Sequence, residues 1–397
     1  MSEKEIKGTI EEVFSYSARH PARLLEEYRA AGQKAVGILP YYAPEELVYA
    51  AGMAPLGLWG MEGSVRGAGR YFPAFYCAIA RMNLEMALVG VLDGLSAVLA
   101  PSICDAMRPF TQNFKSARPD IPMIFLAQPQ NRTEEFGVVY MTDELARVRE
   151  ELEAVAGTRI TDDAIRDAIA VYNESRAERR RFVRLAASHP SVITPERRSD
   201  VLKSAWFMPK PRHTAVLKTL NDAIEALAPE NWTGGKVVVS GILADSASLL
   251  SVFQDNRLAI VADDVANESR SFRSDMPLPE KDEAPLRILA RGFAGQGADS
   301  LLHDPDLSRR ARHLKGLVEE SGAQGVVFVM MQFCDPEELD YPHLKQALDA
   351  VGIPNAQIGY DQQMRDFGQA RTQLEAFSEM LADRGRRDCS AASSTGR

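Results

Sequence analysis

Two cysteines of this chain follow the same pattern. In "SAVLAPSICDAMRPF" and in "VFVMMQFCDPEEL", an apolar run typical of a buried strand leads through a short turn to Cys-Asp and then to a helical pattern. Cys104 and Cys334 are therefore predicted at strand-to-helix junctions, and Cys77 at the start of another predicted helix. Because a thiolate is both a nucleophile and a metal ligand, these residues are the first candidates for chemistry.

The predicted positions of these cysteines favour ligand binding. Ligands of open α/β sheets bind beyond the carboxyl ends of the strands, where helix N-termini offer free N–H groups and the positive end of the helix dipole. Two facing domains could bring Cys77, Cys104 and Cys334 together across a cleft. The residues alone leave open that the three are buried, inert thiols, since cysteine is common in cores and dispersed spacing is less specific than a compact motif. Cys389 has no such context.

The composition of the chain limits its partners and its compartment. The 397 residues allow two or three domains, and 45% apolar and 25% charged residues are ordinary for a globular protein. A net charge of −9 argues against nucleic acid as the main partner and against an anionic membrane surface. The N-terminus lacks a signal-peptide pattern, and no run approaches the roughly 20 apolar residues of a membrane span. We therefore expect a cytoplasmic protein whose four cysteines are not a disulfide scaffold.

The elements that must position the cysteines alternate along the first half of the chain. We expect N-terminal helices over 1–33 and a first α/β domain over 34–141, with the strands "KAVGILP", "APLGLWG", "LSAVLAP" and "PMIFLAQ". Over 142–228 the pattern changes to long amphipathic helices, with Thr142 and Thr161 as predicted N-caps.

Strand patterns return in the second half. Residues 229–383 are predicted to form a second α/β domain with the strands "KVVVSGI", "LAIVADD", "GVVFVMM" and "NAQIGYD", and 384–397 a disordered tail. The predicted fold class is α/β: two doubly wound, Rossmann-like parallel-sheet domains with an inserted helical layer. Cys77 and Cys104 would belong to the first domain and Cys334 to the second.

Other patterns carry less weight. "GGKVVVSG" is not a phosphate-binding loop, because its glycines and Lys236 precede the strand, and "RGFAGQGADS" has glycines without a preceding strand. The arginine-rich "RAERRRFVR" favours a solvated helix face over phosphate contacts. Asp105 and Asp335, which follow two of the cysteines, are more typical of acids at a helix start than of catalysts.

Stretches spread from about residue 35 to 382 resemble one protein family. They are "GILPYYAPEELVYAAGMAPLGLWG", "FYCAIARMNLEMAL", "CDAMRPFTQNFK", "KVVVSGI", "LAIVADDVANESRSF", "MMQFCDPEELDYPHLKQALDAVGIP" and "RDFGQARTQLEAF". The chain resembles the ATP-dependently activated 2-hydroxyacyl-CoA dehydratases, a family that includes benzoyl-CoA reductases and 2-hydroxyglutaryl-CoA dehydratases. It is most similar to the beta subunits that act in (R)-2-hydroxyglutaryl-CoA dehydration.

The resemblance implies a cofactor and its ligands. In this family three cysteines hold one [4Fe-4S] cluster per subunit, and by motif they correspond to Cys77 in "FYCAIA", Cys104 in "SICDAM" and Cys334 in "QFCDPEE". Three thiolates leave one of the four irons without a protein ligand. That open position can take water, sulfide or a substrate oxygen.

The resemblance also implies a reaction, the loss of water from a 2-hydroxyacyl-CoA to give a 2-enoyl-CoA. The proton to be removed lies β to the thioester carbonyl, where no neighbouring group acidifies it. General acid–base catalysis supplies only roughly 10²–10⁴-fold, which is not enough. In the family, one low-potential electron turns the thioester carbonyl into a ketyl radical anion that expels hydroxide, and the electron later returns.

The implied partners are a homologous alpha subunit, an acyl-CoA substrate and an ATP-hydrolysing iron–sulfur activator. A separate activator agrees with the lack of a phosphate-binding loop in this sequence. In the family, substrate binds at the cluster of the alpha subunit, and the cluster of the beta subunit passes the electron along. Some members also carry a reduced flavin, although nothing in this sequence marks a flavin site.

Four further residues are candidates for the site. "LPYYAPEEL" places Tyr41 and Glu46 at a strand-to-helix junction, where they line the cleft or an interface, or serve only in capping and packing. Ser269 and Arg270 follow "VADD" in the same kind of position, and as hydrogen-bond donors near a cluster they would tune its potential.

Two other functions remain open from the sequence. The chain could belong to a benzoyl-CoA reductase-type enzyme, which keeps the cluster but reduces an aromatic ring. It could also be a cluster-free, CoA-binding interaction subunit whose cysteines are buried thiols.

Overall fold

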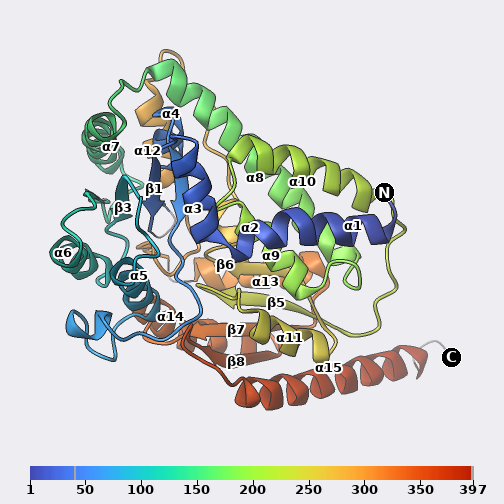
Figure 1. The fold of residues 1–397 in the computed structure, drawn as a ribbon. Helices are drawn as coiled ribbons and strands as arrows, with labels where there is room; N and C mark the ends of the chain where they lie inside the picture. Colours follow the sequence, from blue (N-terminus) through green and yellow to red (C-terminus); the bar gives the residue numbers. More distant parts are fainter. Residues whose placement is uncertain (40–41, 307, 395–397) are drawn as a thin grey trace.

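The chain, described here by a computed structural model, forms two sheets surrounded by helices (Figure 1). The structure describes residues 1–39, 42–306 and 308–394, with 387–394 described by their backbone alone. Both sheets have four strands, and all paired strands are parallel. The predicted α/β class with two parallel sheets and a helical insertion is therefore confirmed.

The two sheets have the same strand order. The first has the order β2-β1-β3-β4, and its strands are β1 (Ala35–Ile38), β2 (Ala54–Gly57), β3 (Ala97–Pro101) and β4 (Met123–Leu126). The second has the order β6-β5-β7-β8, and its strands are β5 (Gly235–Gly241), β6 (Leu258–Val265), β7 (Gly325–Met331) and β8 (Asn355–Tyr360). In each sheet the strand order reverses beside the first strand, between β1 and β3 or between β5 and β7. Such a reversal opens a crevice at the carboxyl ends of the strands.

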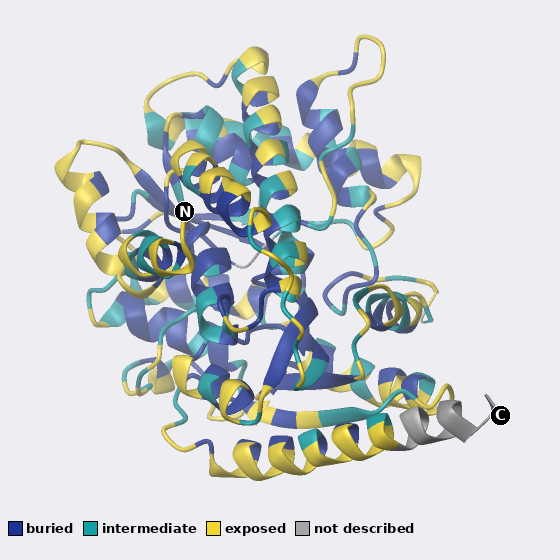
Figure 2. Cartoon of the chain, turned by 90° about the vertical axis from the view of Figure 1, so that its right-hand side faces the viewer, coloured by how far each residue is buried: buried dark blue, intermediate teal, exposed yellow. Residues whose placement is uncertain are grey.

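Helices cover both faces of each sheet, and most strand residues are buried (Figure 2). The first sheet packs on one face against α4 (Glu45–Ala50), α7 (Glu135–Ala156) and α12 (Pro285–Ala294), and on the other against α5 (Ala78–Leu88) and α6 (Met107–Ala117). The second sheet packs against α11 (Ala247–Asp255) and α15 (Gly368–Ser394) on one face, and against α13 (Arg309–Ser321) and α14 (Asp335–Asp349) on the other. Two short 3-10 turns are η2 (Ala68–Arg70) and η3 (Ser269–Ser271).

The remaining helices form the N-terminal segment and the inserted layer. The N-terminal segment contains α1 (Glu3–Thr9), the π-helical turn η1 (Ile10–Ser15), α2 (Tyr16–Arg19) and α3 (Pro21–Ala30). The inserted layer contains α7, α8 (Asp162–Ser188), α9 (Pro195–Ser204) and α10 (Lys210–Glu225). Helix α1 and η1 pack against α8, α9 and α10 in one hydrophobic cluster, whereas α3 packs in the cluster of the first sheet.

The two predicted N-caps of the inserted layer have different outcomes. Thr161 caps α8, because its side-chain oxygen accepts a hydrogen bond from the N–H of Ala164 at 3.1 Å. The prediction for Thr142 is wrong, since α7 already begins at Glu135 and the Thr142 hydroxyl donates to the Val138 carbonyl inside that helix. The buried face of α7 already includes Gly137 and Val138, so the helix begins before the predicted start at residue 142.

Two other elements differ from the sequence-based expectation. Helix α12 was not predicted, and it packs on the first sheet although it follows β6 in the chain. Helix α15 continues to Ser394, past the predicted domain boundary at residue 383, and the disorder expected for 384–397 stays a prediction.

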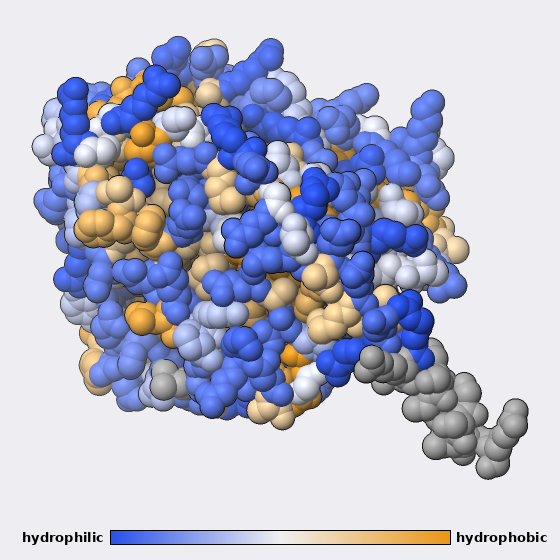
Figure 3. Space-filling model, turned by 90° about the horizontal axis from the view of Figure 1, so that it is seen from below, coloured by the Kyte–Doolittle hydropathy of each residue, from blue (hydrophilic) through white to orange (hydrophobic). Residues whose placement is uncertain are grey.

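None of the described helices combines the length and the apolar character needed to cross a membrane. Seen from below, the surface is mainly hydrophilic, with hydrophobic side chains scattered over it (Figure 3).

Trp206, just after α9, contacts both halves of the molecule, the half built on the first sheet and the half built on the second. Its indole N–H donates to the Asn267 carbonyl at 2.8 Å, its ring meets Trp59 edge-on at 5.2 Å between centroids, and its carbonyl accepts from the Gly57 N–H at 2.9 Å. A side chain on Gly57 would collide with the indole. Trp206 therefore contacts the end of β2 and the segment after β6 at once.

We expect Trp206→Ala to lower the free energy of unfolding by about 3–5 kcal/mol, because it leaves a large cavity between the halves. Urea denaturation followed by circular dichroism measures the change. Val351→Ala, at an exposed site after α14, serves as the control and should stay within about 0.5 kcal/mol of wild type. An unchanged midpoint for Trp206→Ala would show that the indole does not hold the halves together.

Candidate metal centre

A cavity of about 300 Å³ lies where the carboxyl ends of the two sheets face each other. Its lining includes the residues that follow the central strands: Leu39 after β1, Cys104 after β3, Ile242 after β5 and Cys334 after β7. The crevices of both sheets thus open into one space. In open α/β folds this is where ligands bind.

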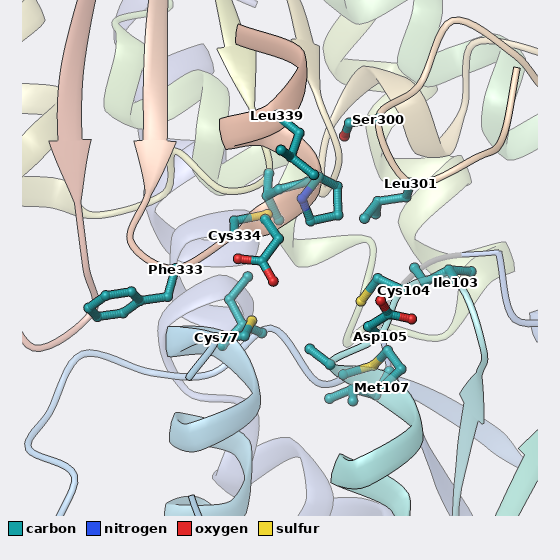
Figure 4. Close-up of a pocket in the computed structure, with 16 residues that line it drawn as sticks. Cys77, Ile103, Cys104, Asp105, Met107, Ser300, Leu301, Phe333, Cys334 and Leu339 are labelled. Atoms are coloured by element: carbon teal, nitrogen blue, oxygen red, sulfur yellow. The ribbon is translucent and has the colours of Figure 1, made fainter. Parts of the chain in front are cut away.

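All three predicted ligand residues line this cavity (Figure 4). Cys77 is the N-cap residue of α5, and Cys334 is the N-cap residue of α14. Cys104 lies in the turn between β3 and α6. The three thiols are free of disulfides. The structure therefore brings together side chains from three distant parts of the sequence, and their role as ligands stays a prediction.

The two acids that follow the cysteines also line the cavity. Asp335 lies in the first turn of α14, as expected for an acid at a helix start. Asp105 lies before α6 begins. The rest of the lining is mainly apolar, with Ile103 and Leu301 among its members.

Burial and helix N-termini act on the thiols in opposite directions. Burial raises the pKa of all three thiols, that of Cys104 to about 12. Backbone N–H groups of the first helical turns lower each pKa in part by donating to the sulfur atoms; the donors belong to Ile79 and Ala80, to Ala106 and Met107, and to Glu337. The thiols are therefore protonated in the metal-free protein, so that metal binding would release protons.

The donor set fits an iron–sulfur cluster better than a single hard cation. Among the described residues, no three His, Cys, Asp or Glu side chains are grouped so that they could hold one metal ion. A cluster does not need such a group, because each thiolate binds a different iron atom. Thiolates are soft ligands, and the N–H groups directed at them are the kind of contact that tunes a cluster.

Tyr76 ties two of the cysteine segments together. Its hydroxyl donates to the Ala106 carbonyl at 2.5 Å, so the residue before Cys77 is bonded to the turn that follows Cys104. The Tyr76 ring stacks on Phe72 with 4.4 Å between centroids. Burial raises the pKa of Tyr76, which keeps the phenol protonated as a donor.

Phe333 makes the sharp turn from β7 into α14. Its φ of 59° lies in the left-handed region, where a bulky side chain is strained. The Phe333 N–H donates to Glu338 Oε1 at 3.2 Å, which helps to hold this conformation. The turn lets Cys334 begin the helix directly beside the end of the strand.

Arg270 lies in a buried network of charges next to the cavity. Its guanidinium binds both oxygens of Asp264, at 2.9 and 3.0 Å, and Glu337 at 2.9 Å. Arg310 binds the same two carboxylates, at 3.2 and 2.8 Å. Burial raises the pKa of Glu337, but the two guanidiniums outweigh it and hold that pKa below its ordinary value. Arg270 is not among the cavity-lining residues, so its role as a donor to a cluster stays a prediction.

Glu46 and Ser269 are not among the residues that line the cavity. Glu46 is buried in α4, where it pairs with Arg176 of α8. The Ser269 hydroxyl donates to the Asp263 carbonyl at 2.6 Å and so holds the loop after β6. Tyr41 lies outside the described residues.

Sequence reasoning missed Tyr76 and Glu337. Tyr76 stands directly before a predicted ligand, and Glu337 is the third residue after another, so their positions were visible. Their contacts could not be predicted, because both residues bond to segments that are remote in the chain.

Comparisons with known proteins match this chain to one family over most of its length. The family described as 2-hydroxyglutaryl-CoA dehydratase, D-component, matches residues 40–381. The chain is 50% identical over 380 residues to the beta subunit of (R)-2-hydroxyglutaryl-CoA dehydratase from Acidaminococcus fermentans, covering 95% of this chain and 100% of the relative. It is 40% identical to the (R)-phenyllactyl-CoA dehydratase beta subunit of Clostridium sporogenes, over 90% and 94%. A benzoyl-CoA reductase subunit from Thauera aromatica is 26% identical, over 88% and 91%.

We expect Tyr76→Phe to lower the free energy of unfolding by about 1 kcal/mol, because it removes one hydrogen bond and keeps the stacked ring. Chemical denaturation of the metal-free chain measures the effect. Tyr140→Phe, on the exposed face of α7, is the matched control and should leave stability unchanged. Equal stabilities of the two variants would mean that the Tyr76 hydroxyl contributes nothing.

Proposed function

Because this chain belongs to the 2-hydroxyglutaryl-CoA dehydratase D-component family, we propose that it is the beta subunit of a 2-hydroxyacyl-CoA dehydratase, a hydro-lyase acting on (R)-2-hydroxyglutaryl-CoA. One observation carries the proposal: Cys77, Cys104 and Cys334 line a single cavity in a chain that is 50% identical to such a subunit over the whole length of that relative. The product would be glutaconyl-CoA.

In this proposal, Cys77, Cys104 and Cys334 hold a [4Fe-4S] cluster and leave one iron without a protein ligand. When bound, the cluster supplies one-electron transfer, so that this subunit relays a low-potential electron for ketyl-radical elimination of water. The chain itself supplies three thiolates and N–H groups of three helix starts, which stabilise negative charge. Most of the other residues that line the site are apolar.

The proposed partners are a homologous alpha subunit, an ATP-hydrolysing iron–sulfur activator and the acyl-CoA substrate. A beta subunit implies an alpha partner, and the relatives named as beta subunits support this. We assign the substrate to the alpha subunit and the cytoplasm as the compartment. A reduced flavin in the complex would be a further cofactor, and no residue of this chain is proposed to bind it. The predicted division into segments 1–33, 34–141, 142–228, 229–383 and 384–397 belongs to the same proposal.

The alternatives have weaker support. The benzoyl-CoA reductase subunit is only 26% identical to this chain, whereas the dehydratase beta subunit is 50% identical, so a dehydratase role has the stronger support. A cluster-free interaction subunit would leave unexplained why three buried or half-buried thiols share one cavity with helix N–H groups directed at them.

We expect Cys77→Ser, Cys104→Ser and Cys334→Ser each to bind substoichiometric iron and to lose the EPR signal of the reduced cluster, because a thiolate ligand is missing. Anaerobic reconstitution with iron and sulfide, followed by metal and EPR analysis, measures this. Wild type and the control Cys389→Ser should both hold about four iron atoms per chain. Full iron in any of the first three variants would remove that residue from the ligand set.

Activity should require the complete system. The chain with its alpha partner, activator, ATP and a reductant should dehydrate (R)-2-hydroxyglutaryl-CoA, and omission of any protein should abolish turnover. Benzoyl-CoA in the same assay, followed by chromatography of the thioesters, tests ring reduction. Reduction of benzoyl-CoA without dehydration would replace the proposal by the reductase alternative.

A further inference from the structure

The carboxylate of Glu337 is buried beside the cavity and accepts hydrogen bonds from three side chains. It is 2% exposed and accepts from Ser300 Oγ at 2.6 Å, from Arg270 at 2.9 Å and from Arg310 at 2.8 Å. Ser300 itself lines the cavity. Glu337 is the third residue of α14, whose N-cap residue is Cys334.

These contacts differ from those of an ordinary first-turn acid. Such a residue commonly reaches back to the backbone N–H of the N-cap residue. Here the Cys334 N–H donates instead to the Met331 carbonyl, and Glu338 takes the Phe333 N–H. The Glu337 side chain is thus free to turn inward, where it meets the arginines.

The arginines fix Glu337 to the ends of two strands. Arg270 binds Asp264 of β6 through two hydrogen bonds, and Arg310 binds Asp264 at 3.2 Å and Ser240 of β5 at 3.2 Å. The start of α14 is therefore clamped to the carboxyl edge of the second sheet. The Glu337 backbone N–H, in the same turn, donates to the Cys334 sulfur.

We propose that Glu337 is a positioning residue that holds the first turn of α14 so that the Cys334 sulfur stays fixed in the cavity. The turn after Cys104 uses another device, the Tyr76 hydrogen bond. Loss of the Glu337 clamp should therefore affect Cys334 selectively. The effect on a bound cluster rests on the proposed function, whereas the position of the thiol in the metal-free chain does not.

Alkylation of the metal-free full chain tests the proposal. Each variant is treated with iodoacetamide, and mass spectrometry follows every cysteine separately, so that Cys77 and Cys104 serve as internal references. We expect Glu337→Gln to raise the rate at Cys334 by about tenfold relative to them, because the first turn of α14 opens more easily and because the negative charge near the sulfur is lost. Ser300→Ala keeps that charge and therefore reports on the opening alone. The control Asp349→Asn removes an exposed pair to Lys345 in the same helix and should change nothing.

Ser300→Ala removes one hydrogen bond to Glu337 and leaves both of its arginine partners in place. This variant therefore still tests the proposal if Glu337→Gln folds poorly. We expect a smaller acceleration at Cys334 alone. Unchanged Cys334 rates, or equal acceleration at all three cysteines in Ser300→Ala, would overturn the proposal.

The reconstituted chain gives a second measurement. The midpoint potential of the cluster, from an EPR redox titration, should change in Glu337→Gln and stay at the wild-type value in Asp349→Asn. An unchanged potential in a fully loaded Glu337→Gln chain would overturn the proposal. If neither the wild type nor any variant took up iron, the proposed function would be contradicted. The alkylation result would still test the role of Glu337, because it is measured on the metal-free chain.

Discussion

The site depends on one constraint, the direction of parallel strands. All strands of a parallel sheet end at the same edge, and helix N-termini gather at that edge. This chain makes two such edges with the same strand order and turns them toward each other. Three sulfur atoms can meet between them because each lies within a few residues of a strand end or a helix start, however far apart they lie in the sequence.

Similar topology does not mean similar local design in the two halves. Cys334 begins its helix directly, after a strained residue, and a buried carboxylate with two arginines fixes the helix start. Cys104 is separated from its helix by a turn, which a tyrosine from the segment of Cys77 holds in place. The cysteines are thus positioned by one clamped helix start in the second half and by two linked segments in the first.

Much of the fold could be predicted because its signals are local. The strands "GVVFVMM" and "LSAVLAP" are apolar runs bounded by turn residues, and the Cys-Asp motifs mark the junctions that follow them. Helix α12 was not predicted, although Leu286, Leu289 and Phe293 have helical spacing. The partners of Tyr76, Glu337 and Arg270 could not be predicted, since each contact joins segments that only the tertiary fold brings together.

The place of α12 has a consequence for the growing polypeptide. This helix covers a face of the first sheet, yet more than a hundred residues, including the whole inserted layer, are translated between β4 and α12. During synthesis the first sheet emerges from the ribosome with part of its apolar face uncovered, and exposed apolar surface promotes aggregation. Completion of the N-terminal half must therefore wait until the ribosome has passed residue 294.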